Sequence, residues 1–240
     1  MLINASSLSY QALNEAIRKG GIECRIEGCL GQRFIAAGMD SRRISIDGIP
    51  GNALGAYLNG ANIEVNGNAQ DAVGDTMNAG TIVVHGNVGD AAGYAMRGGA
   101  IYIQGNAGYR AGVHMKAYGD RLPMIVIGGR AGSFLGEYQA GGVIVVLGLH
   151  AGEQPIVGNF PCTGMHGGKV FLRSDCRDVR FPDQVTARPA PPGELEPLYP
   201  VLERFCELFG EDVEELLDVP FTVATPDSST PYRQIGRAHV

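Results

Sequence analysis

The chain of 240 residues is 45% hydrophobic and 18% charged, contains 36 glycines and no tryptophan, and has a formal net charge of −6. Without a cluster of Lys and Arg, this acidic balance excludes a nucleic-acid-binding protein. We expect neither a membrane span nor a signal peptide, because no apolar run is long enough and no basic segment follows Met1. The five unevenly spaced cysteines fit neither a disulfide framework nor a zinc site, and they favour a cytoplasmic location.

Residues 8–19 predict a helix at the start of the chain. One face of this helix is apolar, and Gly20 follows it as an end signal. The predicted face consists of Leu8, Ala12, Leu13, Ala16 and Ile17. We therefore expect residues 1–20 to form an N-terminal cap.

Residues 21–180 contain a repeated apolar-x-apolar-x-Gly unit. It begins at Ile63, Ile82 and Ile101, with an interval of 19 residues each time. Further units begin at Ile44, Ile125 and Ile144, and weaker ones at Cys24 and Val170. A period near 19 is too short for helix pairs or propeller blades, but it suits one coil of a β-solenoid. The sequence therefore predicts an all-β solenoid, a parallel β-helix of about seven to eight coils with short capping helices at both ends.

Two glycine columns and one asparagine column accompany the repeat. We expect the glycines to serve tight turns and the asparagines to form a short ladder between coils, in left-handed geometry. The first glycine of the units is Gly48, Gly67, Gly86, Gly105, Gly129 and Gly148, and the second is Gly55, Gly74, Gly93, Gly112 and Gly136. The asparagines that follow the first glycine are Asn68, Asn87 and Asn106.

The interior should consist of residues that occupy the same position in successive coils. We expect two aliphatic columns, one methionine column and one column of small residues. These columns are Ile63/Ile82/Ile101/Ile125/Ile144, Val65/Val84/Ile103/Ile127/Val146, Met77/Met96/Met115 and Ala69/Val88/Ala107/Ala131.

One irregular segment interrupts the coils, and a third region follows them. Lys116–Pro123 is charged and is the only insertion that we expect, so we interpret it as a contact loop. Residues 181–240 predict a proline-rich connector (182–197), two short helices (198–209 and 212–217) and an extended tail (218–234) that could lie across a partner. The last six residues, Ile235–Val240, match the translation of a common sequencing adapter, so we expect the natural C-terminus to differ.

Several residues could carry chemistry, and each also has a structural explanation. Asp71 and Asp90 should stack about 5 Å apart, as in a retaining glycosidase, but no long loops build a sugar cleft around them. Glycine-rich stretches resemble a phosphate cradle, yet no helix is expected after them. Cys24 and Cys29 have no second pair to complete a metal site. Four of the five histidines, His85, His114, His150 and His166, fall at different points of the coil and should not converge, and His166 is the one to test.

The motifs of the repeat resemble a known family. Gly74–Gly80 (GDTMNAG), Gly86–Gly89 (GNVG) and Gly93–Gly99 (GYAMRGG) are similar to the GXGXG family. That family includes the C-terminal β-helix of the glutamate synthase large subunit and the β-helical subunit of formylmethanofuran dehydrogenase. The resemblance, over roughly residues 20–175, implies a right-handed helix. Gly128–Tyr138 (GGRAGSFLGEY), Val157–Asn159 and Gly164–Gly168 (GMHGG) look closer to glutamate synthase.

The resemblance implies a non-catalytic assembly subunit of a split glutamate synthase, an oxidoreductase of nitrogen metabolism and glutamate biosynthesis. Partner chains with glutaminase and synthase domains would carry the chemistry, and the synthase chain would hold FMN and an iron-sulfur cluster. We expect no catalytic, cofactor-binding or metal-binding residue in this chain. Two alternatives stay open: the β-helical subunit of a formylmethanofuran dehydrogenase-like complex, and an autonomous β-helix enzyme.

Overall fold

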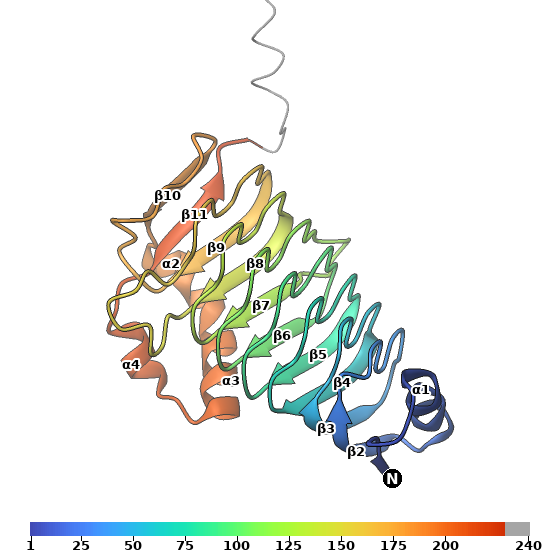
Figure 1. The fold of residues 1–240 in the computed structure, drawn as a ribbon. Coiled ribbons are helices and arrows are strands. Elements are labelled where there is room, and N and C mark those ends of the chain that lie inside the picture. Colours follow the sequence, from blue (N-terminus) through green and yellow to red (C-terminus); the bar gives the residue numbers. More distant parts are fainter. Residues whose placement is uncertain (229–240) are drawn as a thin grey trace, which may run out of the picture.

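The structure, a computed structural model, describes residues 1–228 as a β-solenoid with short helices at its ends (Figure 1). Its strands form one 11-stranded sheet in the order β1-β2-β3-β4-β5-β6-β7-β8-β9-β11-β10. The strands of the coils are β2 (Glu23–Leu30), β3 (Arg43–Ile49), β4 (Asn59–Asn66), β5 (Ala79–Val84), β6 (Ala100–Ile103), β7 (Met124–Ile127), β8 (Ala140–Val146) and β9 (Gly167–Leu172). Each pairs in parallel with the next, so the predicted β-solenoid is confirmed.

The interior columns form as the repeat predicts. Ile63 pairs with Ile82, and Ile82 pairs with Ile101. All three are buried, and so are Met77, Met96 and Met115, each with 0% of its surface exposed. Isolated parallel bridges join the small column through Ala69, Val88, Ala107 and Ala131. Burying one such aliphatic side chain contributes roughly 1.5–3 kcal/mol, so the stacked columns are the main source of stability.

The asparagine ladder runs from side chain to backbone. The Oδ1 atom of Asn68 accepts from the amide of Asn87 at 2.8 Å, and that of Asn87 accepts from the amide of Asn106 at 2.7 Å. The ladder ends where Asn106 Oδ1 accepts from the amide of Arg130 at 2.7 Å. Our expectation of left-handed geometry was wrong, because none of the three asparagines has a positive φ. Their role is to supply an acceptor to the next coil.

The two glycine columns exclude side chains for different reasons. At Gly105, a Cβ atom would lie 2.4 Å from Asn87 Oδ1, so a side chain would collide with the ladder. At Gly74, φ is +69°, and a Cβ atom would lie 2.5 Å from Ile101 Cδ1 in the core. At Gly86, Gly105 and Gly129 the first position therefore needs glycine for close approach, whereas Gly48, Gly67 and Gly148 also have a positive φ. The second position needs glycine for both conformation and space.

The N-terminal cap contains a strand as well as a helix. Strand β1 (Leu2–Asn4) pairs in parallel with β2, and Ile3 lies opposite Ile26. Helix α1 (Tyr10–Lys19) follows and buries Leu13, Ile17 and Asn14. Ala12 is exposed, so the predicted apolar face was partly wrong. Asn14 is buried because its Oδ1 atom accepts from the amide of Ala36 at 3.1 Å, which satisfies a donor of the first coil.

The C-terminal region closes the last coil with two strands. Strand β10 (Val185–Pro189) lies within the predicted connector, and β11 (Thr222–Pro226) lies within the predicted extended tail. Strand β11 pairs antiparallel with both β9 and β10, so the expectation that residues 222–226 lie across a partner was wrong. This pairing protects the open edge of β9. The adapter-like hexapeptide and the rest of 229–240 lie outside the described residues.

Short helices connect β10 to β11. They are α2 (Pro192–Leu195), a 3-10 turn (Glu196–Leu198), α3 (Tyr199–Phe209) and α4 (Val213–Leu217). Asp212 caps α4 by accepting from the amide of Glu214 at 2.7 Å. No helix among residues 1–228 is both long and apolar enough to cross a membrane.

The coils contain a second insertion, which the spacing of 26 residues between the units at Ile144 and Val170 already indicates. Ile144 pairs with Val170, so the coil between β8 and β9 is 26 residues long. The expectation that Lys116–Pro123 is the only insertion was therefore wrong. The added segment contains Gly148 and Gly152, both with positive φ, and its composition is like that of an ordinary turn.

We predict that replacing Asn87 with Ala lowers the free energy of unfolding by about 1 kcal/mol, because the amide of Asn106 loses its acceptor. Urea unfolding followed by circular dichroism measures this loss. The control is Asn87→Asp, which keeps an acceptor oxygen and should stay close to the wild type. Equal losses in the two variants would contradict the ladder interpretation.

Candidate functional site

The outward face of the sheet changes character along the solenoid. Its central row consists of Arg25, Ser45, Glu64, Val83, Tyr102, Val126, Val145 and Phe171. From Val83 onward the row is buried and forms a second apolar cluster with α3, which contributes Leu202 and Phe205. The first three members are polar, and α3 does not cover them. The helix therefore protects only the half of the face that is apolar.

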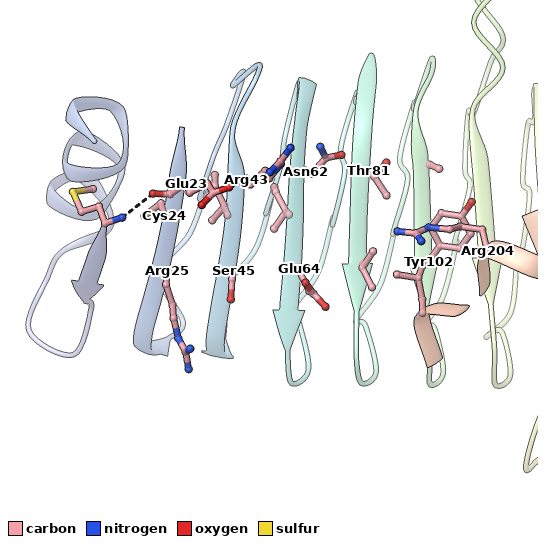
Figure 2. A pocket seen from close by; sticks show the side chains of 16 residues that line it. Glu23, Cys24, Arg25, Arg43, Ser45, Asn62, Glu64, Thr81, Tyr102 and Arg204 are labelled. Carbon is pink, nitrogen blue, oxygen red and sulfur yellow. Dashed lines mark hydrogen bonds and ion pairs between the residues drawn. The ribbon is translucent and has the colours of Figure 1, made fainter. Parts of the chain in front are cut away.

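The uncovered half forms an open groove of about 680 Å³. Figure 2 shows side chains from successive strands arranged along it, from Glu23 to Tyr102. Arg204 and Leu208 of α3 line its far end, and Met1 lines the near end, where the terminal ammonium donates to the carbonyl of Glu23 at 2.9 Å. The groove thus begins where the coverage by α3 stops.

The charges in and beside the groove neutralise one another. Arg43 pairs with Glu23 at 3.0 Å, and Arg25 pairs with Asp47 at 2.8 Å. The pKa of Asp47 is lowered, first by a hydrogen bond from Asn66 and then by Arg25. Both pairs are exposed to solvent, which screens them, so they add little to stability. The Met1 ammonium and the Glu64 carboxylate, which also line the groove, contact a carbonyl and a histidine respectively.

The buried ionisable groups of the groove are held in their neutral forms. Burial raises the pKa of the Tyr102 phenol, and Arg204 opposes this effect only in part. Burial likewise raises the pKa of the Cys24 thiol. A neutral phenol and a neutral thiol are poor bases and poor nucleophiles.

One contact joins the groove to the end of α3. His85 Nε2 lies 2.9 Å from Glu64 Oε1, and the His85 ring meets the Phe209 ring edge-on, with 5.2 Å between centroids. Glu64 is half exposed and lines the groove. This pair fixes the last turn of α3 against β4 and β5.

Asp71 and Asp90 belong to a second ladder. Asp71 Oδ1 accepts from the amide of Asp90 at 2.9 Å, and Asp90 Oδ1 accepts from the amide of Tyr109 at 2.8 Å. The sequence reasoning missed Asn52, which accepts from the amide of Asp71 in the same way at 3.3 Å. The signal was the 19-residue spacing of these three residues. Their shared contact explains the acidic pair without catalysis.

The glycine-rich turns do not expose amides as a phosphate site requires. In the turn after β5, the amide of Asn87 donates to Asn68, and the amide of Gly89 donates to the carbonyl of Ala69. The chain then continues into the next coil and not into a helix. Stacking of the coils has already used these donors.

The histidines lie in separate environments. His114 stacks on Tyr138 with 5.1 Å between ring centroids, whereas His166 Nδ1 lies 3.1 Å from the carbonyl oxygen of Gly164. His150 lies in the second insertion with φ of +62°. Within residues 1–228, no three His, Cys, Asp or Glu side chains gather as a metal site requires. That the chain carries no catalytic, cofactor-binding or metal-binding residue stays a prediction.

Comparisons with known proteins show the family of the chain and a solved structure with the same fold. The family model described as GXGXG motif matches residues 9–219. The uncharacterized protein MJ1350 of Methanocaldococcus jannaschii is 39% identical over 98% of this chain and 95% of its own length. A chain in the crystal structure of the formyltransferase/hydrolase complex from Methylorubrum extorquens, determined with methylofuran, has the same fold. It gives a TM-score of 0.63 at 20% identity and covers 94% of this chain and 90% of that one.

We predict that Cys29 and Cys162 resist iodoacetamide in the folded protein at pH 8. Burial raises their pKa values to about 11 and about 12, so almost no thiolate is present at that pH. Mass spectrometry of tryptic peptides measures the labelling, and protein unfolded in urea provides the control. Rapid labelling of the folded protein would contradict the burial of these thiols.

The same shifts predict loss of stability in alkali. Above pH 9, the ordinary pKa of a thiol, the unfolded chain releases these protons while the folded chain keeps them, so the free energy of unfolding falls as pH rises from about 9 to about 12. Urea unfolding across this range measures the slope. Cys162→Ala should reduce the slope, and an unchanged slope would contradict this explanation.

Proposed function

The chain belongs to the GXGXG motif family, and from this premise we propose that it is a non-catalytic assembly subunit of a multi-chain glutamate synthase. The observation that carries the proposal is that the polar groups of the coil are committed to neighbouring coils. Asp71 and Asp90, the best candidates for chemistry, serve as backbone acceptors. The chain therefore interacts with other molecules through its outer surface, by contact and not by catalysis.

The groove supports an assembly role. Helix α3 covers the apolar half of the outward face, and the polar half between β2 and β5 is left open. Balanced ion pairs such as Arg43–Glu23 suit a contact surface with a polar rim. A partner chain laid over this half would complete the layer that α3 begins.

The choice of glutamate synthase rests on sequence. Gly128–Tyr138, Val157–Asn159 and Gly164–Gly168 resemble that enzyme more closely. The proposed partners are a glutaminase chain and a synthase chain that holds FMN and an iron-sulfur cluster. Together they would transfer the amide nitrogen of glutamine to 2-oxoglutarate and reduce the product to glutamate. No step of this reaction is assigned to the present chain. We place the complex in the cytoplasm, where the five free cysteines would stay reduced.

A second candidate is a subunit of a formylmethanofuran dehydrogenase-like complex. The observation that favours it is the structural similarity to a chain of the formyltransferase/hydrolase complex over nearly the full length of both chains. Because the two chains are only 20% identical, this similarity shows that their folds are alike and nothing about their functions. The proposal of an assembly subunit is the same for both candidates, and the identity of the partners separates them.

We predict that the tagged chain, purified from the cells that make it, brings down a glutaminase chain and a yellow-brown flavin and iron-sulfur chain. Mass spectrometry identifies the chains, and visible absorbance of the eluate detects the cofactors. The control is the same purification from cells that carry the tag alone.

Each outcome has a distinct meaning. A molybdopterin-containing partner would replace glutamate synthase with the second candidate. A colourless chain without any partner, at micromolar concentration, would overturn the assembly role and restore the question of autonomous activity.

A further inference from the structure

Exposed rings gather on one turn of the coils between β5 and β9, away from the groove. The His114 ring lies between Tyr94, at 6.1 Å, and Tyr138, at 5.1 Å between centroids. Tyr94 is 41% exposed and Tyr138 is 45% exposed, so this stack is open to solvent. Because the three residues belong to three consecutive coils, the rings form a continuous strip along the solenoid.

A second strip lies at the preceding position of the same turn. The Phe134 ring stacks on Phe160 at 5.3 Å, and the Arg110 guanidinium lies over Phe134, 4.9 Å from its centroid. Glu137 pairs with Arg110 at 3.0 Å and ties the two strips together. Phe160 is 61% exposed. Tyr109, directly before Arg110 in the chain, is 54% exposed. We name this surface the aromatic corner; it consists of Tyr94, Tyr109, His114, Phe134, Tyr138 and Phe160.

The backbone of the turn gives no reason for aromatic residues. Phe134, Tyr138 and Phe160 have φ of +64°, +53° and +59°, a region that glycine and asparagine adopt more readily. The middle coils place Ala72 and Ala91 at the position that Phe134 occupies, and the first coil places Phe34 there, where its ring meets Tyr10 of α1. Half-exposed rings also add little to the stability of the isolated chain. Their presence is explained if another molecule covers them.

The charge beside the corner is mainly positive, with Asp120 as the acidic member of the Lys116–Pro123 segment. Arg97, Lys116 and Arg121 are exposed and form no ion pair within residues 1–228. Contacts on either side of Arg97 make the three residues neighbours. The carbonyl of Met96, the residue before Arg97, accepts from the amide of Lys116. A Cβ atom built on Gly98, the residue after Arg97, would lie 3.1 Å from the Cβ of Arg121. The same insertion presents Tyr118 and Leu122, which are 65% and 54% exposed. Aromatic residues bordered by arginine are typical of the centre of a protein interface.

This positive surface stands out in an acidic chain. The net charge is −6, and the helical region 199–218 alone contains seven Asp and Glu residues and one Arg. Cationic and aromatic side chains are therefore concentrated at the corner while acidic ones are concentrated elsewhere. A partner that matches the corner must present acidic side chains around an apolar surface.

We propose that the aromatic corner, together with the Lys116–Pro123 loop, docks an acidic face of a partner protein chain in the complex. This inference rests on the proposed function, because it names the surface through which the assembly subunit holds one partner. It extends the prediction that Lys116–Pro123 is a contact loop to six rings outside that loop.

The test compares tagged variants purified under the conditions that recover the partners. Tyr138→Ser combined with Phe160→Ser removes two exposed rings, and Arg97→Glu combined with Lys116→Glu reverses the charge. We expect each pair to lower recovery of one identified partner chain about tenfold or more. The matched control is Tyr57→Ser, which occupies the same turn position nearer the N-terminus, with φ of +57° and 58% exposure.

The outcomes separate the two proposals. If the wild-type chain recovers no partner, the proposed function fails. If the wild type and both double variants recover the partner equally, and circular dichroism shows that all are folded, the assembly role stands and the docking surface is wrong. If light scattering shows that the wild type self-associates and the double variants are monomers, a second copy occupies the corner and the proposal is overturned.

Discussion

The parallel stacking of coils in register is the constraint on which the rest of this structure depends. Each coil donates amides to the coils on both sides, as Gly74 does to the carbonyl of Leu54 and Ala72 to that of Asp90. In the regular coils a side chain therefore stands directly above its counterpart 19 residues away. The register makes the core a set of columns such as Ile63, Ile82 and Ile101. It also turns short polar side chains such as Asn87 and Asp90 into acceptors for the next coil. Groups that look reactive in the sequence are thereby committed to stability.

A stack of this kind needs termination, and each end solves the problem differently. At the start, β1 adds one more parallel strand and α1 covers the first coil, where Asn14 satisfies the amide of Ala36. At the end, β11 reverses direction against β9, which stops further parallel growth. The chain between β10 and β11 then places α3 on the outward face of the sheet. The groove exists because α3 is shorter than the face that it covers.

A feature of this fold can be predicted from the sequence when it recurs in most of the coils. The strands, the interior columns and the second glycine position recur in most coils, so a period near 19 was enough to place them. Strand β11 could not be found in this way, because it pairs antiparallel with β9 and repeats nothing. The geometry of Asn68 and its successors was also misjudged, since their role depends on the amide of the next coil. The groove depends on where α3 packs, which is a tertiary property without a local signal.

The residues at outward positions give the most information about function. A solenoid can vary any position that points outward without disturbing its register, so outward positions record what the surface contacts. In the central outward row, residues change from polar at Glu64 to apolar at Val83 where α3 begins to cover them, which shows that this row follows what lies on it. At one turn position of the aromatic corner the residues change from Ala72 and Ala91 through Arg110 to Phe134 and Phe160. Phe34 of the first coil also occupies this position and packs against Tyr10, whereas no element among residues 1–228 covers Phe160. Val83 is apolar because α3 covers it. The rings of the aromatic corner are explained in the same way if another chain covers them.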